Sequence, residues 1–215
     1  MSGICYSELI FAQPLMKKYQ LVSVYTRPSY KPCKSKPNSS AIQNVLDKEF
    51  LAERPMQKIT TDLTYVRVAD SWCYCCFVLD LHNREIIGVS VGEHKTADLV
   101  LEAMKSIPYS LKDTELFHTD RGSEFVNSKL DQLLETNGIE RSLSAPGTPY
   151  DNAVFERTYR SYKTELVKQM EFQTIDSLRV FTLDYVHWWN HVRIHSSLIN
   201  LTPVEFKKAN QSMFS

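Results

Sequence analysis

The sequence predicts an α/β fold: a mixed five-stranded sheet with flanking helices, an extended N-terminal arm and C-terminal helices. Three observations predict it. Residues 59–91 consist largely of apolar runs of strand length. Beyond them, helix and strand patterns alternate and end in a long helix. Three acids, Asp62, Asp120 and Glu156, fall on three separate elements. Only a specific fold could bring acids so distant in sequence to one point.

Composition limits the chain to one sizeable core with a smaller appendage, because it has 215 residues and 43% hydrophobic content. Its five cysteines follow no disulfide or zinc-knuckle spacing, which indicates a reducing cytoplasm. Cys73, Cys75 and Cys76 lie in an apolar stretch, where cysteine more often acts as a small hydrophobe than as a soft-metal ligand. No run reaches the roughly 18 apolar residues of a membrane span, and no signal peptide is recognisable.

The charge pattern leaves two interpretations open. A formal net charge of zero argues mildly against a nucleic-acid binder. However, every charged residue in positions 9–46 is basic, and such a tract is either a solvated tail or a track for a phosphate backbone. These residues are Lys17, Lys18, Arg27, Lys31, Lys34 and Lys36.

Residues 1–57 are expected to form this basic arm, with a helical piece near 15–20, a polar stretch over 27–40 and a helix over 41–51. Residues 58–172 are expected to form the core, and 173–215 a helical extension packed on it. The extension ends in a short helix that begins with a capping box at Thr202 and has proline in its first position.

The core begins with three predicted strands. Residues 59–68 alternate, so that Asp62 projects from one face of a strand. Residues 74–81 and 85–91 are nearly continuous apolar runs, which predicts an antiparallel meander buried on both sides.

Helices and two short strands follow. Thr96 caps a helix that Pro108 stops, a strand over 116–119 ends at Asp120, and Gly138 closes the next helix. A strand over 140–143 leads to a long helix that begins near Asp151 or Asn152. Three strands followed by helix, strand, helix, strand and helix is the element order of a ribonuclease H-like domain.

Three converging carboxylates are typical of metal-dependent nucleases, because two divalent ions about 4 Å apart activate the attacking oxygen and stabilise the leaving one. Each acid also has a structural interpretation: Asp120 as a turn residue, Glu156 as an acid favoured by a helix dipole. Asp62 is harder to dismiss, because an acid inside an apolar strand is costly unless it is paired. Asp80 is a rival in a second strand, ranked lower because it precedes a hairpin turn.

Helical geometry places Tyr159, Arg160 and Lys163 on the same side as Glu156. This stripe suits a metal ligand beside a phosphate track. The alternative is a simple Glu156 to Arg160 pair at i,i+4 spacing, worth about 0.3 to 0.5 kcal/mol.

His187, His191 and His195 recur every fourth residue. On one continuous helix this spacing could form a zinc-binding stripe, but packing is the favoured interpretation. Arg193 and the neighbouring tryptophans suit packing or DNA contact.

Three segments resemble the catalytic blocks of bacterial insertion-sequence transposases with a retroviral-integrase-like core: 61–65 (TDLTY), 117–125 (FHTDRGSEF) and 150–156 (YDNAVFE). The chain is similar, more narrowly, to the second reading-frame product of two-frame elements, from about Leu15 to Phe206. Residues that resemble the family's C-terminal signature are Trp189, Asn190, Arg193, His195, Leu198, Thr202, Pro203 and Phe206.

The resemblance implies a DDE transposase that cuts and joins DNA strands. Asp62, Asp120 and Glu156 would hold two Mg²⁺ ions when DNA is bound, with Mn²⁺ as a substitute. Lys163 would contact DNA near the element end, and Asn152 would order the glutamate or approach the scissile strand. Expected partners are element-end and target DNA, further copies of the chain, and an upstream-frame helix-turn-helix product, all in a nucleoid-associated, cytoplasmic setting.

The chain departs from the family pattern at three points. The tryptophan common before the first aspartate is absent, and Arg121 and Glu124 replace commoner glutamines. Only residues 1–14 precede the stretch that resembles the family, which suggests a shortened form. Two other functions therefore stay open: a nuclease that cuts without joining, and an inactive DNA-binding remnant.

Overall fold

The computed structural model describes residues 14–19, 21, 42–125, 127–146 and 148–211. The chain divides into two compact units, residues 1–33 and 34–215. In the first, residues 14–18 form a short helix, close to the helix predicted near 15–20. The polar stretch 27–40, with its four basic residues, lies outside the described residues.

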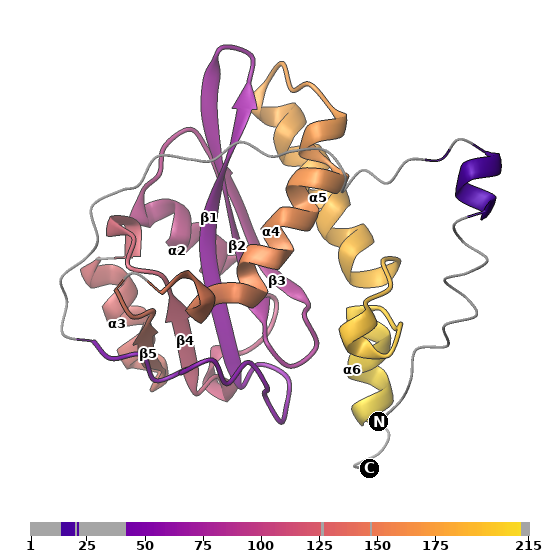
Figure 1. The fold of residues 1–215 in the computed structure, drawn as a ribbon. Coiled ribbons are helices and arrows are strands. Elements are labelled where there is room, and N and C mark those ends of the chain that lie inside the picture. Colours follow the sequence, from indigo (N-terminus) through magenta and orange to yellow (C-terminus); the bar gives the residue numbers. More distant parts are fainter. Residues whose placement is uncertain (1–13, 20, 22–41, 126, 147, 212–215) are drawn as a thin grey trace. The chain divides into compact units, whose positions relative to one another are not determined.

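The second unit contains a five-stranded sheet in the order β3-β2-β1-β4-β5 (Figure 1). Strands β1 (Lys58–Val68), β2 (Ser71–Asp80) and β3 (Ile86–Gly92) form an antiparallel meander. Strands β4 (Leu116–Thr119) and β5 (Glu140–Leu143) continue the sheet parallel to β1. The predicted mixed sheet and its ribonuclease H-like element order are confirmed.

Helices cover both faces of this sheet (Figure 1). The α-helices are α2 (Ala97–Lys105), α3 (Ser128–Asn137), α4 (Ala153–Glu165), α5 (Ile175–His191) and α6 (Pro203–Gln211). Short 3-10 helices are η2 (Leu111–Asp113), η3 (Ser123–Phe125), η4 (Pro149–Asn152), η5 (Val167–Gln169) and η6 (Ser196–Leu198).

Strand alternation divides the core into two layers. Cys76 and Val78 pack with α2 and α3, whereas Cys75, Phe77 and Leu79 pack with α4 and α5. The cysteines at positions 73, 75 and 76 are buried and free, which confirms the apolar interpretation. A strand buried on both faces explains why residues 74–81 are apolar apart from Asp80.

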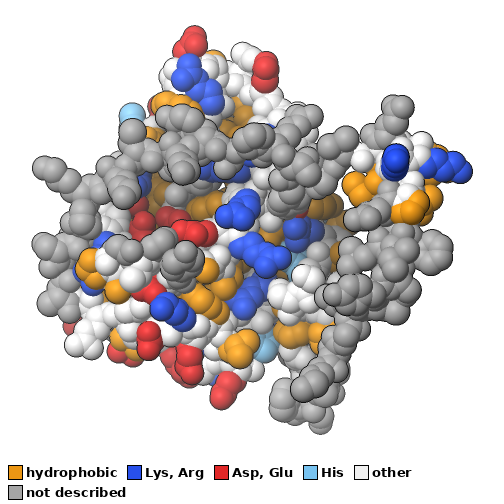
Figure 2. Space-filling model, in the orientation of Figure 1, with side chains coloured by type: hydrophobic (Ala, Val, Ile, Leu, Met, Phe, Trp, Pro, Cys, Tyr) orange, Lys and Arg blue, Asp and Glu red, His pale blue; other side chains and the backbone are white. Residues whose placement is uncertain are grey.

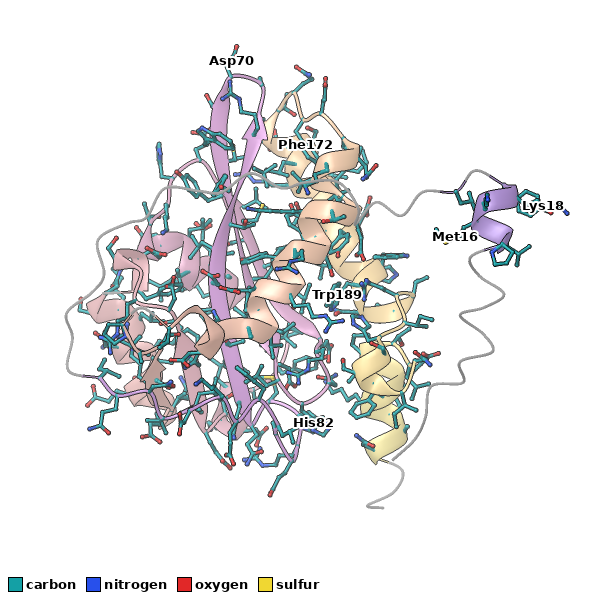
Figure 3. The ribbon with its side chains drawn as sticks, in the orientation of Figure 1. Met16, Lys18, Asp70, His82, Phe172 and Trp189 are labelled. Carbon is teal, nitrogen blue, oxygen red and sulfur yellow. The ribbon has the colours of Figure 1, made fainter. Side chains whose placement is uncertain are left out.

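The turns that join these elements follow the predicted caps. Thr96 accepts the Leu99 N–H at the start of α2, and Gly138, with φ of 69°, ends α3. Thr202 and Glu205 form the predicted reciprocal capping box of α6, with bonds of 2.9 and 3.2 Å. Figure 3 shows Phe172 beside the tip of the β1–β2 hairpin, where it bridges to Val68.

The predicted helix over 41–51 is wrong for the described residues 42–51. Asp47 and Lys48 have φ of 38° and 64°, which a right-handed helix excludes. The backbone N–H groups of Val45 and Leu46 both donate to Ser142 Oγ, each at 3.0 Å. Side-chain bonds to β5 therefore outweigh the local helical pattern and hold this segment as a non-helical strap.

Asp80 has the structural role that ranked it below Asp62. Its Oδ2 accepts the Met56 N–H at 2.8 Å, and its Oδ1 accepts the His82 N–H at 2.9 Å. The carboxylate therefore orders the β2–β3 hairpin. Among the helices that the structure describes, none is long and apolar enough to cross a bilayer.

Candidate active site

Strand register brings Asp62 and Asp120 side by side. Thr61 on β1 pairs with Thr119 on β4 in parallel register, so the next residue on each chain is an aspartate. Adjacent strands lie about 4.8 Å apart, and paired positions direct their side chains to the same face. Asp62 also pairs with Phe77, which packs in the α4 layer. The two acids therefore meet on the face of the sheet that α4 covers.

Burial and mutual repulsion set the protonation of this pair. Loss of hydration raises the pKa of Asp62 well above its usual 3.8, and the Asp120 charge raises it further. Loss of hydration also raises the pKa of Asp120, although the Gly122 N–H donates to its Oδ1 at 2.8 Å and opposes that rise. Two such carboxylates favour a proton or a bound cation.

A third carboxylate near the pair comes from Glu124, which sequence analysis noted only as a departure from the family pattern. Its side chain is 1% exposed and lies 2.9 Å from the Lys95 ammonium. Its charge raises the pKa of both Asp62 and Asp120. The sequence signal that could have identified Glu124 is an acid, four residues after the second aspartate, where the family commonly has glutamine.

Glu156 lies on the first turn of α4 and is exposed. Partial burial raises its pKa, and the nearby Arg160 guanidinium opposes that rise. Over residues 14–19, 21, 42–125, 127–146 and 148–211, no three His, Cys, Asp or Glu side chains lie close enough to hold a metal as they stand. The structure thus brings two of the three predicted acids together and leaves Glu156 as a predicted ligand.

Tyr159 fixes α4 to the strand that carries Asp62. Its hydroxyl donates to the Asp62 carbonyl oxygen and accepts the Phe77 N–H at 3.1 Å. Tyr159, which was predicted to share the Glu156 side of α4, is 6% exposed and packs into the core. The hydroxyl finds backbone partners in the sheet, and these draw the ring into the core.

Replacement of Tyr159 by phenylalanine should lower the free energy of unfolding by about 1 to 3 kcal/mol, because the buried Phe77 N–H loses its partner. The helix that carries Glu156 should also loosen. Urea titration measures the first effect, and amide hydrogen exchange along α4 measures the second. Tyr74→Phe, on the half-buried β2 residue, is the matched control; equal effects of both variants would contradict this role.

Lys163 lies near the acids, as the predicted contact with DNA requires. Its Nζ sits 4.2 Å from the centre of the Tyr65 ring. Loss of hydration lowers the pKa of its ammonium, and the Asp62 charge opposes that decrease. Arg160 is exposed on the same helix. Figure 2 shows basic side chains over α4 next to a group of acidic side chains beside β1.

Asn152 and Arg193 are engaged within the protein. Asn152 is 6% exposed, and its Oδ1 accepts the Thr60 hydroxyl at 3.2 Å. This burial favours the ordering role over contact with DNA. The Arg193 guanidinium bonds to both Glu165 oxygens and stacks 4.7 Å from the Trp189 ring. It also lines a pocket of about 490 Å³ that Arg84 and Arg157 share.

The C-terminal histidines do not share one helix. His191 is the last residue of α5, and its ring lies 4.5 Å from that of His187. His195 comes after the helix and packs 4.4 Å from the Trp189 ring. Packing therefore accounts for His195, as the favoured interpretation expected.

Chemically, the Asp62 and Asp120 pair fits a divalent metal. Oxygen ligands that carry charge and lack hydration suit Mg²⁺, which binds through one or two carboxylates and keeps waters or phosphates as its other ligands. Among the described residues, Glu124 Oε2 is a further buried oxygen that has no hydrogen-bond partner. The site therefore offers carboxylate oxygens of the kind that a divalent cation prefers.

Comparisons with known proteins agree with this geometry. Two family models, both described as Integrase core domain, match residues 52–149 and 137–203. The chain is 32% identical over 171 residues to the transposase InsF of insertion sequence IS3A from Escherichia coli K12. That alignment covers 78% of this chain and 59% of the relative, so the chain spans less than two thirds of the relative's length.

Solved structures share the fold at low identity. The catalytic core domain of BIV integrase has a TM-score of 0.56 and 18% identity, over 74% of this chain and 99% of that one. The HTLV-2 integrase catalytic core domain in complex with magnesium has a TM-score of 0.51 and 15% identity, over 72% and 98%. The two family models together span residues 52–203, so the chain belongs to the proteins with an integrase core domain.

Proposed function

We propose that this chain cuts DNA at the ends of an insertion sequence and joins them to another strand in a reaction that depends on divalent metal. The observation that carries the proposal is the parallel pairing of Thr61 with Thr119, because Asp62 and Asp120 are the next residues on the two segments. A buried pair of like charges costs stability, so a structural role alone does not account for the two aspartates. A role in metal binding accounts for them.

In the proposed reaction, the residues of the chain hold the metal and position the reacting groups. Asp62 and Asp120 bind the metal, and Glu156 completes the site from α4. Held by these acids, Mg²⁺ would supply Lewis-acid activation of the phosphodiester and of the attacking water or, later, DNA 3′-hydroxyl. Tyr159 holds the backbone of Asp62, and the Gly122 N–H holds the carboxylate of Asp120. Pre-organised positioning of this kind supplies much of the rate enhancement in phosphoryl transfer.

We assign DNA contact first to Lys163 and Arg160. Both are cations on α4, and the charge of Lys163 acts on Asp62. Arg193 and the rest of its pocket form a second basic region beside α4, suited to a DNA phosphate. Asn152 does not contact DNA in this proposal; it holds the start of α4 to β1 through its hydrogen bond with Thr60.

The metal is proposed to be Mg²⁺, with Mn²⁺ as a substitute, and two ions are proposed per site when DNA is bound. All-oxygen ligands favour these ions over softer metals. Several copies of the chain are proposed to act together, because two element ends have to be brought to one target. An upstream-frame helix-turn-helix product is the proposed additional partner, and the nucleoid the proposed setting.

A strand-joining assay tests this function. The purified chain is incubated with labelled DNA that carries the element's ends, in Mg²⁺, Mn²⁺, Ca²⁺ or chelator. We expect nicks and joined products with Mg²⁺ or Mn²⁺, and neither with chelator. Nicks without joined products would favour the cut-only nuclease. Binding without nicks in any metal would favour the inactive remnant.

A further inference from the structure

We propose that Glu124 is an additional carboxylate ligand of the metal site and that the Lys95 ammonium is its resident counter-ion, with which divalent metal competes. This inference rests on the proposed function, since it concerns the same site. It departs from the predicted set of three acids. In this chain, the loop after β4 would itself supply a ligand.

The loop that follows β4 folds the Glu124 carboxylate back toward Asp120. A Cβ built on Gly122 would lie 2.2 Å from Glu124 Oε1, so the carboxylate occupies the space of a missing side chain. The Gly122 N–H meanwhile donates to Asp120 Oδ1 at 2.8 Å. One glycine thus lies against both carboxylates and brings them close together.

The Glu124 carboxylate is buried and incompletely satisfied. Its side chain is 1% exposed, and Oε2 has no hydrogen-bond partner among the described residues. A buried carboxylate oxygen without a partner is costly, and native proteins rarely keep one without a use. Gly122 lies against the Glu124 carboxylate and donates to Asp120, and the Glu124 charge raises the pKa of both Asp62 and Asp120.

Lys95 is the cation that this cluster already has. Its Nζ lies 2.9 Å from Glu124 Oε1, and the charges of Glu124, Asp120 and Asp62 all raise the pKa of its ammonium against the effect of burial. When ionised, the three carboxylates outnumber the ammonium groups of Lys95 and Lys163 that act on them. A divalent cation would offset the remaining negative charge.

The Lys95 ammonium can also leave Glu124. Lys95 precedes Thr96, the N-cap of α2, and its side chain is 37% exposed, so the ammonium can turn to solvent without disturbing the helix. An ammonium offers one charge on a flexible stem, whereas a divalent ion offers two at a fixed point. Glu124 should therefore bind the metal at high metal concentration and pair with Lys95 at low metal concentration.

The experiment measures metal binding to the whole chain without DNA. Mn²⁺ affinity is measured by electron paramagnetic resonance, and Tb³⁺ luminescence lifetimes count the waters on the bound ion. Glu124→Gln should weaken Mn²⁺ binding roughly tenfold or more and raise the Tb³⁺ water count, because a ligand is lost. Lys95→Met should instead tighten Mn²⁺ binding and enlarge the metal-induced rise in melting temperature.

Glu93→Gln is the matched control, because it removes the same charge from an exposed position two residues before Lys95. Its effect should stay below about twofold, since solvent screens that charge. Glu124→Gln with unchanged affinity and water count, or Lys95→Met with weakened affinity, would overturn the inference. Melting curves without metal verify that each variant is folded.

Asp120→Asn separates this inference from the function on which it rests. If Asp120→Asn abolishes Mn²⁺ binding and Glu124→Gln does not weaken it, the metal site stands and only the role of Glu124 fails. If Asp120→Asn leaves Mn²⁺ binding intact, the site itself is elsewhere and the proposed function fails with it.

Discussion

Replacement of Asp120 by asparagine should reduce DNA nicking and joining by about 10³-fold or more, equivalent to roughly 4 kcal/mol of transition-state stabilisation. The amide keeps an oxygen that can accept the Gly122 N–H, so the loop after β4 should hold its shape. What is lost is one of two negative charges that hold the metal. Initial rates in Mg²⁺ and in Mn²⁺ measure the effect.

The same variant should be more stable than the parent chain when metal is absent. The folded state raises the pKa of both Asp62 and Asp120 above the usual 3.8, so it holds more protons than the unfolded state above that pH. The contribution of the pair to the free energy of unfolding therefore falls as pH rises from about 4 through the raised pKa values. Asp120→Asn removes the repulsion, and its advantage at pH 7 should shrink toward pH 4.

Urea titrations at pH 7 and pH 4.5, with chelator present, measure this advantage. Asp98→Asn is the control, since Asp98 is exposed and paired with Lys129 across 3.6 Å. It should change neither rate nor stability appreciably. A rate loss in Asp120→Asn with a matching loss of stability would point to misfolding, and full activity would refute the site.

Replacement of Glu156 by glutamine should cost about 10²- to 10³-fold in the same assay. Glu156 is exposed, and the charge that acts on it is that of Arg160. Its removal should therefore leave the metal-free stability within about 0.5 kcal/mol. Activity would fall because the carboxylate is needed only once metal and DNA are bound.

Glu102→Gln on α2, also exposed, is the matched control and should keep full activity. Glu156→Gln and Glu124→Gln together identify the third acid. Loss of rate in Glu156→Gln alone would leave the predicted triad intact, with Glu124 not needed for catalysis. Loss of rate in Glu124→Gln alone would assign the third position to the loop after β4.

The strand and helix order could be predicted from the sequence because it depends on local signals. The alternating residues of β1, the nearly continuous apolar run of β2 and the caps at Thr96 and Gly138 each act over a few neighbours. The strap over 42–51 could not be predicted, because two of its backbone N–H groups donate to Ser142, which lies far along the chain. A local helical pattern does not encode that competition.

For the site, the sequence by itself determined the identity of the acids, and their elements followed from pattern and resemblance. Only the tertiary structure decided which of them meet. Asp62 and Asp120 lie side by side because β1 and β4 pair in parallel register, and the Glu124 carboxylate lies against Gly122 because that glycine has no Cβ to exclude it. Tyr159 likewise lies in the core because the backbone of β1 and β2 offers hydrogen-bond partners to its hydroxyl. Register, burial and packing are relations between distant segments, and they exist only when the chain has folded.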